Sequence, residues 1–360
     1  MQHHNADRIE FLDTIGGTVT IKKVGTARWQ LKQRVLKGVD NAQNPTWIRI
    51  DNPGATRKIE LEHLWADTDW PHWRMFGYQK IGDVYSAVRG VEIPESTTYR
   101  LEVPAGISWF GAFPWYTNED GESFLTQVAS QPLCRVRMIG QTARRRPIKC
   151  LTIGQDKAGR ENVVVFARTH AMETPGSFAV EGITDFLLKD PTGKKLLNRY
   201  VFHLFPIVNP DGVAAGLKFT RLGPKEKYDM AVVAMTSEDS TMVALRQEIH
   251  RLRPACFIDY HSYPMRIPGI FFFDNNVGIA VLRELLIKNK NTEAGFYYRG
   301  MITDNRSHKD TLWAHCFLHY QATVVVVELS WNLGLLPCDV SREGVNMFHA
   351  TMKAHARRTR

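Results

Sequence analysis

The chain has 360 residues, of which 44% are hydrophobic and 23% charged, and its formal net charge is +9. This composition can bury a substantial core, which excludes a disordered tail. No apolar run is long enough to span a bilayer, and the opening MQHHNADRIE lacks the apolar core of a signal peptide. We therefore expect a cytoplasmic protein that does not associate with membranes.

The first third of the chain has the pattern of an all-β domain. From Gly16 to about Phe113, short apolar and aromatic segments alternate with turn-forming residues such as Asn52-Pro53-Gly54. These segments include TVTIKKV, TWIRI, KIELEHLWA and TYRLEVP. Alternation with a period of two at this spacing is typical of a β-sandwich. We assign residues 1–115 to such a domain.

The pattern changes after Pro114. Apolar strands are now separated by helical stretches, such as Asp239 to Leu252 and Ile279 to Lys290. This alternation predicts an α/β domain over residues 116–360, with helices covering both faces of a sheet. The chain has five cysteines and no C-x-x-C pair, so neither a disulfide framework nor a cysteine zinc site is expected.

His170 and Glu173 form an H-x-x-E pair between two patterned segments. The apolar run Val163 to Ala167 predicts a buried strand, and Thr174 followed by Pro175 predicts the N-cap and first residue of a helix. The pair therefore falls on a strand-to-helix loop, where a rigid scaffold can expose two metal ligands to a substrate. Taken alone, this short motif also occurs by chance in loops that bind no metal.

A catalytic zinc ion usually has three protein ligands and an open position for water. The candidate third ligand is His261, which follows an apolar run from Cys256 to Tyr260. Glu328 follows the run Val324 to Val327, where a carboxylate is costly unless it is paired or used, so it is a candidate base. Each residue alone has a structural alternative, a hydrogen-bonded core histidine for the first and an ion-pair partner for the second.

Together, four segments resemble the M14 zinc carboxypeptidases, most closely their cytosolic carboxypeptidase branch, which trims glutamates from acidic tails. The segments are HAMETPGSF, FPIVNPDGV, DYHSYP and VVVVELSW, and they occur in the family's order. The NPDG tetrapeptide within them is first of all a turn signal. The resemblance covers about Trp109 to Trp331, and it implies a β domain followed by an α/β/α domain with a mixed sheet.

The resemblance also implies one zinc ion per chain, held by His170, Glu173 and His261. Zinc at this site supports hydrolysis of an amide, with Glu328 accepting a proton from water and passing it to the leaving amine. Arg221 resembles the family arginine that stabilises the developing oxyanion, although it could also be an ordinary surface arginine.

The chain departs from the family where an Asp-Leu-Asn-Arg segment grips the substrate's terminal carboxylate. The best-aligned residues are Tyr228-Asp229-Met230-Ala231, and neither Met nor Ala offers the planar two-point pairing of arginine. Tyr263 and Arg266 are candidate substrate contacts. The cations that could replace the missing arginine from other loops are Arg266, Arg299 and Arg306.

Three functions remain open on the sequence. The first is a zinc hydrolase of glutamyl or other acidic peptide bonds, the second a zinc hydrolase of a small-molecule amide, and the third a silent protein that binds acidic tails. The positive charge suits an acidic substrate, although its densest run, Arg144-Arg145-Arg146, is also explained by a solvated turn. No nucleic-acid-binding signature is present, so no nucleic acid partner is expected. The sequence defines neither the substrate nor the oligomeric state.

Overall fold

The chain divides into two compact units in a computed structural model. One unit consists of residues 1–115 with the later segments 214–218 and 331–337, and the other contains the remainder. The sequence-based boundary between residues 115 and 116 stays our proposal for the domain division. The structure describes residues 9–13, 19–33, 46–65, 75–93, 95–155, 157–217, 220–221, 227–228, 230–263, 269–288, 297–299, 310–330 and 334–358.

The first unit contains two five-stranded sheets. One sheet consists, in spatial order, of β1 (Glu10–Asp13), β4 (Trp47–Asn52), β10 (Gly106–Gly111), β6 (Phe76–Ile81) and β7 (Val84–Arg89). The other consists of β2 (Val19–Lys23), β3 (Arg28–Gln33), β5 (Arg57–Leu64), β9 (Ser96–Val103) and β8 (Val91–Ile93). Alternate residues of β3, β5 and β9 are buried, as expected for strands with one face against a core.

One hydrophobic core is shared by the two sheets. It contains Ile48, Ile50 and Phe110 from the first sheet and Leu31 and Leu61 from the second. Two sheets packed over one core form a sandwich, so the prediction of an all-β N-terminal domain is confirmed.

The second unit is built on an eight-stranded mixed sheet. Its strands are, in spatial order, β11 (Cys134–Gln141), β12 (Pro147–Ile153), β14 (Tyr200–Phe205), β13 (Glu161–Ala167), β17 (Cys256–Tyr263), β20 (Thr323–Ser330), β18 (Gly269–Phe272) and β19 (Tyr297–Arg299). The four central strands β14, β13, β17 and β20 are parallel. Ligand sites in such sheets lie beyond the carboxyl ends of the parallel strands.

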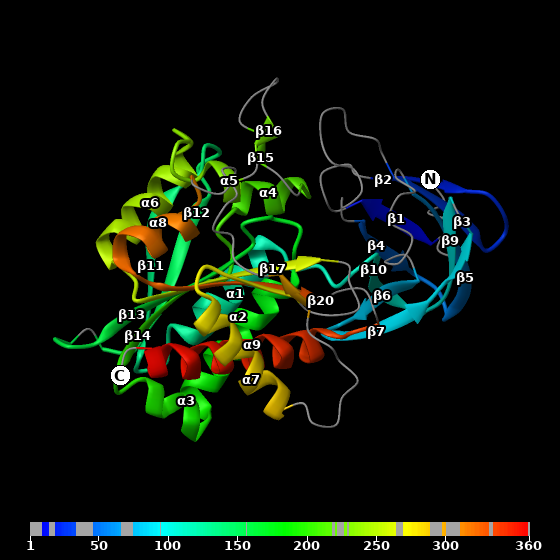
Figure 1. Ribbon diagram of the computed structural model, residues 1–360. Coiled ribbons are helices and arrows are strands. Elements are labelled where there is room, and N and C mark those ends of the chain that lie inside the picture. The colour runs from blue at the N-terminus through cyan, green and yellow to red at the C-terminus, as the bar shows by residue number, and fades with distance from the viewer. Residues whose placement is uncertain are drawn as a thin grey trace. The chain divides into compact units, whose positions relative to one another are not determined.

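Helices cover both faces of this sheet, which confirms the predicted α/β/α architecture (Figure 1). The helices are α1 (Asn118–Val128), α2 (Pro175–Lys189), α3 (Pro191–Leu196), α4 (Pro210–Ala215), α5 (Met230–Val233), α6 (Ser240–Leu252), α7 (Asn275–Lys288), α8 (Leu312–Tyr320) and α9 (Pro337–Arg358). A short two-stranded sheet, β15 (Thr220–Arg221) and β16 (Lys227–Tyr228), completes the unit.

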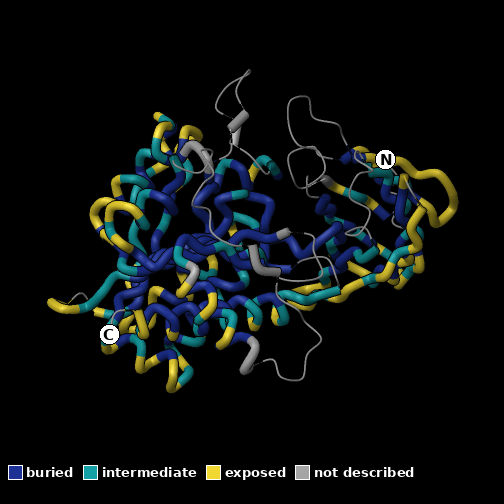
Figure 2. The backbone as a smooth tube through the Cα atoms, viewed as in Figure 1, coloured by how far each residue is buried: buried dark blue, intermediate teal, exposed yellow. Residues whose placement is uncertain are grey.

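The central strands are buried because both of their faces are covered (Figure 2). On one face, α6 and α8 share a core cluster with β13, β14, β17 and β20, to which Leu245, Phe257 and Val326 belong. On the other face α2 and α9 pack on the sheet, where the Tyr260 hydroxyl donates a hydrogen bond of 2.7 Å to the Gly344 carbonyl oxygen of α9. Within the described residues, no helix is long and apolar enough to cross a membrane.

Several element boundaries differ from those that the sequence predicts. Pro175 begins α2 as expected, but Thr174 is not its side-chain cap, because its backbone is already helical and its side chain makes no capping hydrogen bond. β17 and β20 continue beyond the apolar runs that predict them, to Tyr263 and Ser330. His261 and Glu328 therefore lie inside strands, because backbone pairing continues where side chains become polar.

Candidate metal centre

The three predicted zinc ligands are brought together at the carboxyl ends of the parallel strands. His170 and Glu173 lie in the loop between β13 and α2, and His261 lies on β17. Their ligand atoms all lie within 4.8 Å of one another. The start of α2 packs tightly on the sheet, because a Cβ added at Gly176 of α2 would meet the carbonyl oxygen of Tyr260 on β17 at 3.0 Å. This packing holds the loop before α2 close to the sheet.

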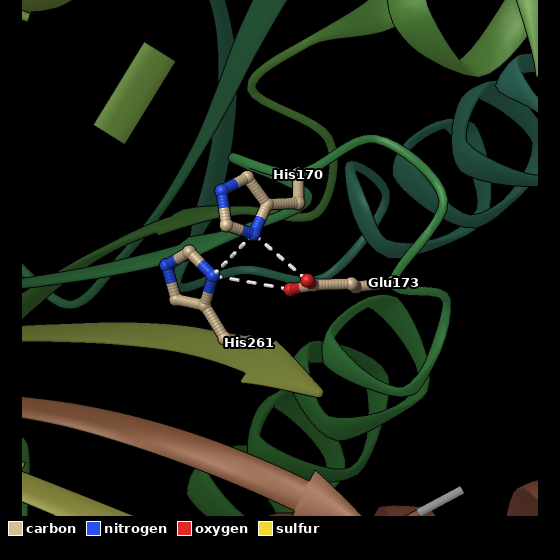
Figure 3. A group of neighbouring side chains, drawn as sticks. All are labelled: His170, Glu173 and His261. Atoms are coloured by element: carbon tan, nitrogen blue, oxygen red, sulfur yellow. Dashed lines mark hydrogen bonds and ion pairs between the residues drawn. The ribbon is translucent and has the colours of Figure 1, made fainter. Parts of the chain in front are cut away.

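The two imidazoles and the carboxylate point toward one centre (Figure 3). His170 Nδ1 lies 2.8 Å from Glu173 Oε1, His261 Nδ1 lies 3.1 Å from Glu173 Oε2, and the two Nδ1 atoms are 3.2 Å apart. Glu173 is further fixed by the Ser262 backbone N–H, which donates to its Oε2 at 3.0 Å. Glu173 and His261 are buried, whereas His170 is partly exposed.

This donor set fits zinc. Two imidazole nitrogens and one carboxylate oxygen are among the ligands that catalytic zinc prefers. Bonds of about 2.0 to 2.2 Å in a tetrahedron place ligand atoms roughly 3.3 to 3.6 Å apart. The observed separations of 2.8, 3.1 and 3.2 Å are all shorter than this range, so the three side chains would have to move apart to accept the ion, and His170 and Glu173 would have to move furthest.

The electrostatics of the centre favour a cation. Burial acts to raise the pKa of Glu173, but the adjacent His170 and His261 outweigh it and lower that pKa. Burial acts to lower the pKa of His261, but Asp259 and Glu173 outweigh it and raise that pKa well above the usual range. The carboxylate is therefore ionised at neutral pH, and positive charge between these side chains is stabilised, whether it is a proton or a metal ion.

Asp259 orients His261 from behind. Its Oδ2 lies 3.2 Å from His261 Nε2, the ring nitrogen that faces away from the centre. Asp259 also accepts hydrogen bonds from Thr169 Oγ1 at 3.0 Å and from Trp313 Nε1 at 2.8 Å. A carboxylate behind a histidine fixes the ring's tautomer and orientation for metal binding.

Glu328, the predicted base, is paired with His261 in the parallel ladder between β17 and β20. On its other side it is paired with Gly269 of β18, which has no side chain that could cover it. Glu328 is partly exposed, unlike the four valines that precede it. The candidate base and the candidate third ligand thus occupy adjacent positions on neighbouring strands.

The other predicted site residues are only partly described. Arg221 lies on β15 and Tyr263 ends β17, but their side chains are outside the described part of the structure. The same holds for the side chain of Arg299 on β19. Arg266 and Arg306 lie outside the described residues altogether.

Met230 and Ala231, which align with the missing carboxylate clamp, are core residues. Both lie on α5, are at most 5% exposed, and belong to the same cluster as the buried faces of α6 and α8. Packing therefore accounts for both side chains.

Sequence reasoning missed two buried charged residues near the centre, Asp259 and Arg168. The sequence does indicate both residues. Arg168 directly follows the apolar run Val163 to Ala167, and Asp259 interrupts the run Cys256 to Tyr260. A charge in such a place requires partners. Two hydrogen-bond donors to Asp259, Thr169 and Trp313, are distant from it in sequence and become its neighbours only in the fold.

Part of the chain matches a known protein family. Residues 122–233 match the sequence profile of the zinc carboxypeptidase family. Over this segment the chain is similar to the M14 zinc carboxypeptidase family. The segment contains His170 and Glu173, together with the NPDG turn.

Its curated relatives lie in the cytosolic carboxypeptidase branch. Cytosolic carboxypeptidase 2 of Macaca fascicularis is 32% identical over 119 residues, which is 30% of this chain and 14% of the relative. Cytosolic carboxypeptidase 3 of Mus musculus is 31% identical over 187 residues, which is 48% of this chain and 19% of the relative. The chain thus matches less than a fifth of the length of either relative.

Solved structures share the fold over nearly the whole chain. A metallo-carboxypeptidase from Burkholderia cenocepacia superposes with a TM-score of 0.81 at 18% identity, covering 98% of this chain and 100% of that one. A metallo-carboxypeptidase from Pseudomonas aeruginosa gives a TM-score of 0.79 at 14% identity, with 98% and 100% coverage. At these identities the likeness establishes the fold.

Proposed function

We propose that this protein is a zinc-dependent hydrolase of amide bonds in acidic peptides, with one zinc ion per chain and a site of action in the cytoplasm. The observation that carries the proposal is the convergence of His170, Glu173 and His261 beside Glu328. The match of residues 122–233 to the zinc carboxypeptidase family supports the metal and the reaction class.

Each side chain has a defined task in this proposal. His170 and His261 would hold zinc through Nδ1 and Glu173 through its carboxylate, while Asp259 keeps the His261 ring in the binding orientation. Zinc held there would supply Lewis-acid chemistry, which polarises a carbonyl and lowers the pKa of a water molecule. Glu328 would accept a proton from the attacking water molecule and return it to the leaving amine, which is general base and then general acid catalysis. Arg221 is our candidate for stabilising the oxyanion.

The substrate differs from that of an ordinary carboxypeptidase in how its carboxylate is recognised. Met230 and Ala231 are buried in the core and offer no positive charge, so a terminal carboxylate finds no partner at these positions. An unpaired carboxylate in a closed site is costly. We therefore propose that an acidic group elsewhere on the substrate is recognised, with Tyr263 and Arg266 as candidate contacts.

The same observation favours a second candidate function. A site without a carboxylate clamp at α5 also suits a small-molecule amide that has no terminal carboxylate. Such a substrate needs the zinc ligands and Glu328 but no exopeptidase recognition. A silent acidic-tail-binding protein is less well supported, because a base beside the metal ligands has no use in simple binding.

A substrate panel separates these functions. The zinc-loaded protein is incubated with acidic peptides that have a free C-terminus, with the same peptides amidated, and with small N-acyl and N-aminoacyl amides. We expect hydrolysis that does not require a free terminal carboxylate, and no hydrolysis by Glu328→Gln. Release of only the last residue from free-terminus peptides, abolished by amidation, would instead indicate an ordinary exopeptidase. Zinc-loaded protein that binds the peptides and cleaves none of these compounds would indicate the binding function.

A further inference from the structure

The loop that carries two of the metal ligands is attached to a buried arginine. We propose that Arg168 is a positioning residue, whose guanidinium holds the backbone between His170 and Glu173 so that both side chains can meet His261. This inference rests on the metal centre of the proposed function and extends it to a residue outside the ligand set.

Arg168 follows directly after β13 and is completely buried, at 0% exposure. It is the largest of the fully buried side chains in the described residues. A guanidinium carries a permanent charge and five N–H donors, so burying it is costly unless acceptors surround it. The position of this side chain is therefore fixed by specific contacts.

Those contacts reach three separate segments. The Nε donates to the carbonyl oxygen of Ala171, which lies within the loop between the two ligands. The Nη1 donates to Ser177 Oγ on α2 at 3.2 Å and to the Tyr116 carbonyl oxygen at 3.0 Å. Because the guanidinium is planar and rigid, it fixes these three acceptors relative to one another.

The network continues beyond the arginine. Ser177 Oγ also donates to the Pro206 carbonyl oxygen at 2.8 Å, which attaches α2 to the segment after β14. Inside the loop, the Glu173 N–H donates to the His170 carbonyl oxygen at 3.1 Å. This backbone bond closes the turn, and the bond from Arg168 to Ala171 attaches the turn to its surroundings.

The backbone conformation at Arg168 does not favour arginine, so the side chain must explain why an arginine occupies this position. Its φ is 67°, in the left-handed region that glycine adopts without strain and other residues rarely occupy. Glycine would satisfy the backbone at this position more easily than arginine. The guanidinium contacts are therefore the feature that offsets the strain.

Two variants test the proposal. Arg168→Gly relieves the backbone strain and removes the guanidinium, whereas Arg168→Lys keeps a charge but cannot reach three acceptors. The dissociation constant for zinc is measured by competition with a chelator, and ligand geometry by the visible spectrum of the cobalt-substituted protein. We expect both variants to bind zinc roughly 10- to 100-fold more weakly, as for other residues that orient metal ligands, with an altered cobalt spectrum and no rescue by lysine.

Arg137→Lys is the control for an arginine-to-lysine change in the same unit, because Arg137 lies on β11 and pairs with Glu248, which is no part of the ligand loop. We expect its zinc affinity and cobalt spectrum to equal those of the wild type. Unchanged zinc affinity and spectrum in both Arg168 variants would overturn the proposal. If neither variant folds, Ser177→Ala is measured instead, because it removes one acceptor of the Arg168 side chain. An unchanged dissociation constant for zinc in Ser177→Ala would also overturn the proposal.

The outcome is independent of the substrate. Wild-type protein that binds zinc but hydrolyses no amide contradicts the proposed function, yet the affinities of the variants still decide the role of Arg168. Wild-type protein that binds no zinc contradicts both.

Discussion

Glu328 and His261 are partners in a parallel ladder, so their side chains leave the sheet on the same side. That register places the candidate base on β20 beside the candidate third ligand on β17. Gly269, the partner of Glu328 on the other side, has no side chain that could cover the carboxylate.

Replacing Glu328 by Gln tests its role as the base. The amide has nearly the same shape but cannot accept a proton from water, so we expect turnover to fall by roughly 10²- to 10⁴-fold. Zinc content and the thermal unfolding midpoint should be unchanged. Glu343→Gln, on α9, is a control that should keep its activity. Turnover near the wild-type rate in Glu328→Gln would mean that this carboxylate is structural.

Replacing Asp259 by Asn tests the orientation of His261. The neutral amide cannot stabilise the ring as a carboxylate does, so we expect zinc affinity to fall by about 10- to 100-fold. Asp185→Asn is the control, because Asp185 is exposed on α2 and pairs only with Lys189 in the contacts described. Chelator competition measures both. Equal zinc affinity in Asp259→Asn and wild type would show that Asp259 serves the fold alone.

Among the elements, the segment after β14 supports the ligand loop from a second side. A Cβ added at Gly212, in the NPDG turn at the start of α4, would meet the Ala171 Cβ at 2.6 Å and the Asn209 Nδ2 at 2.7 Å. The Gly212 N–H also donates to Asn209 Oδ1 at 2.9 Å. The turn therefore packs directly against the residue that follows His170.

We accordingly predict that Gly212→Ala disturbs the centre from a distance. Added methyl groups in tight packing typically cost about 1 to 3 kcal/mol, and here the displaced neighbour is Ala171 in the ligand loop. Zinc affinity should fall along with stability. Gly25→Ala is the control, because a Cβ there has only one ordinary contact, at 3.4 Å. If Gly212→Ala lowered the unfolding midpoint but left zinc affinity unchanged, the turn would not be coupled to the loop.

The contact between α6 and β11 predicts a dependence of stability on pH. Burial acts to raise the pKa of Glu248, but hydrogen bonds from Arg251 and Arg137 outweigh it and lower that pKa below its ordinary value of 4.5. A lowered folded-state pKa stabilises the fold above about pH 4.5, and this stabilisation is lost as the pH falls through the folded-state value.

Glu248→Gln should therefore lose about 1.5 to 3 kcal/mol of unfolding free energy at pH 7, the usual range for a hydrogen bond to a charged group. The loss should shrink in denaturant titrations at progressively lower pH. Glu238→Gln, at an exposed position near the start of α6, should match the wild type throughout. A loss that is the same at pH 7 and at acidic pH would argue against the ionic contribution.

The structural features that the sequence predicts correctly are those that depend on a short run of neighbouring residues. Val163 to Ala167 and Val324 to Val327 are continuous β-branched or apolar runs, and both are buried central strands. The strand extension through His261 was missed because ladder pairing is a property of two segments. The burial of Arg168 and Asp259 was missed for the same reason, since only long-range partners make it tolerable.

At the scale of the whole molecule, the net charge is +9, and some of the positive side chains form ion pairs within the fold. In the basic run between β11 and β12, Arg146 Nη1 pairs with Asp211 Oδ1 at 2.7 Å, and the Arg144 N–H donates to Asp211 Oδ2 at 3.1 Å. Arg145 turns the chain with a φ of 60°. The run is thus a turn held against the NPDG segment, which agrees with its structural explanation.

Zinc content is the measurement that tests the central claim most directly. Purified wild-type protein, dialysed against metal-free buffer, should contain about one zinc ion per chain, because three protein ligands and one water satisfy its tetrahedral preference. His170→Ala and His261→Ala should lose most of it, whereas His250→Ala, an exposed histidine on α6, should keep it. Zinc at full occupancy in both ligand variants, or no zinc in wild-type protein supplied with it, would contradict the assignment of this centre.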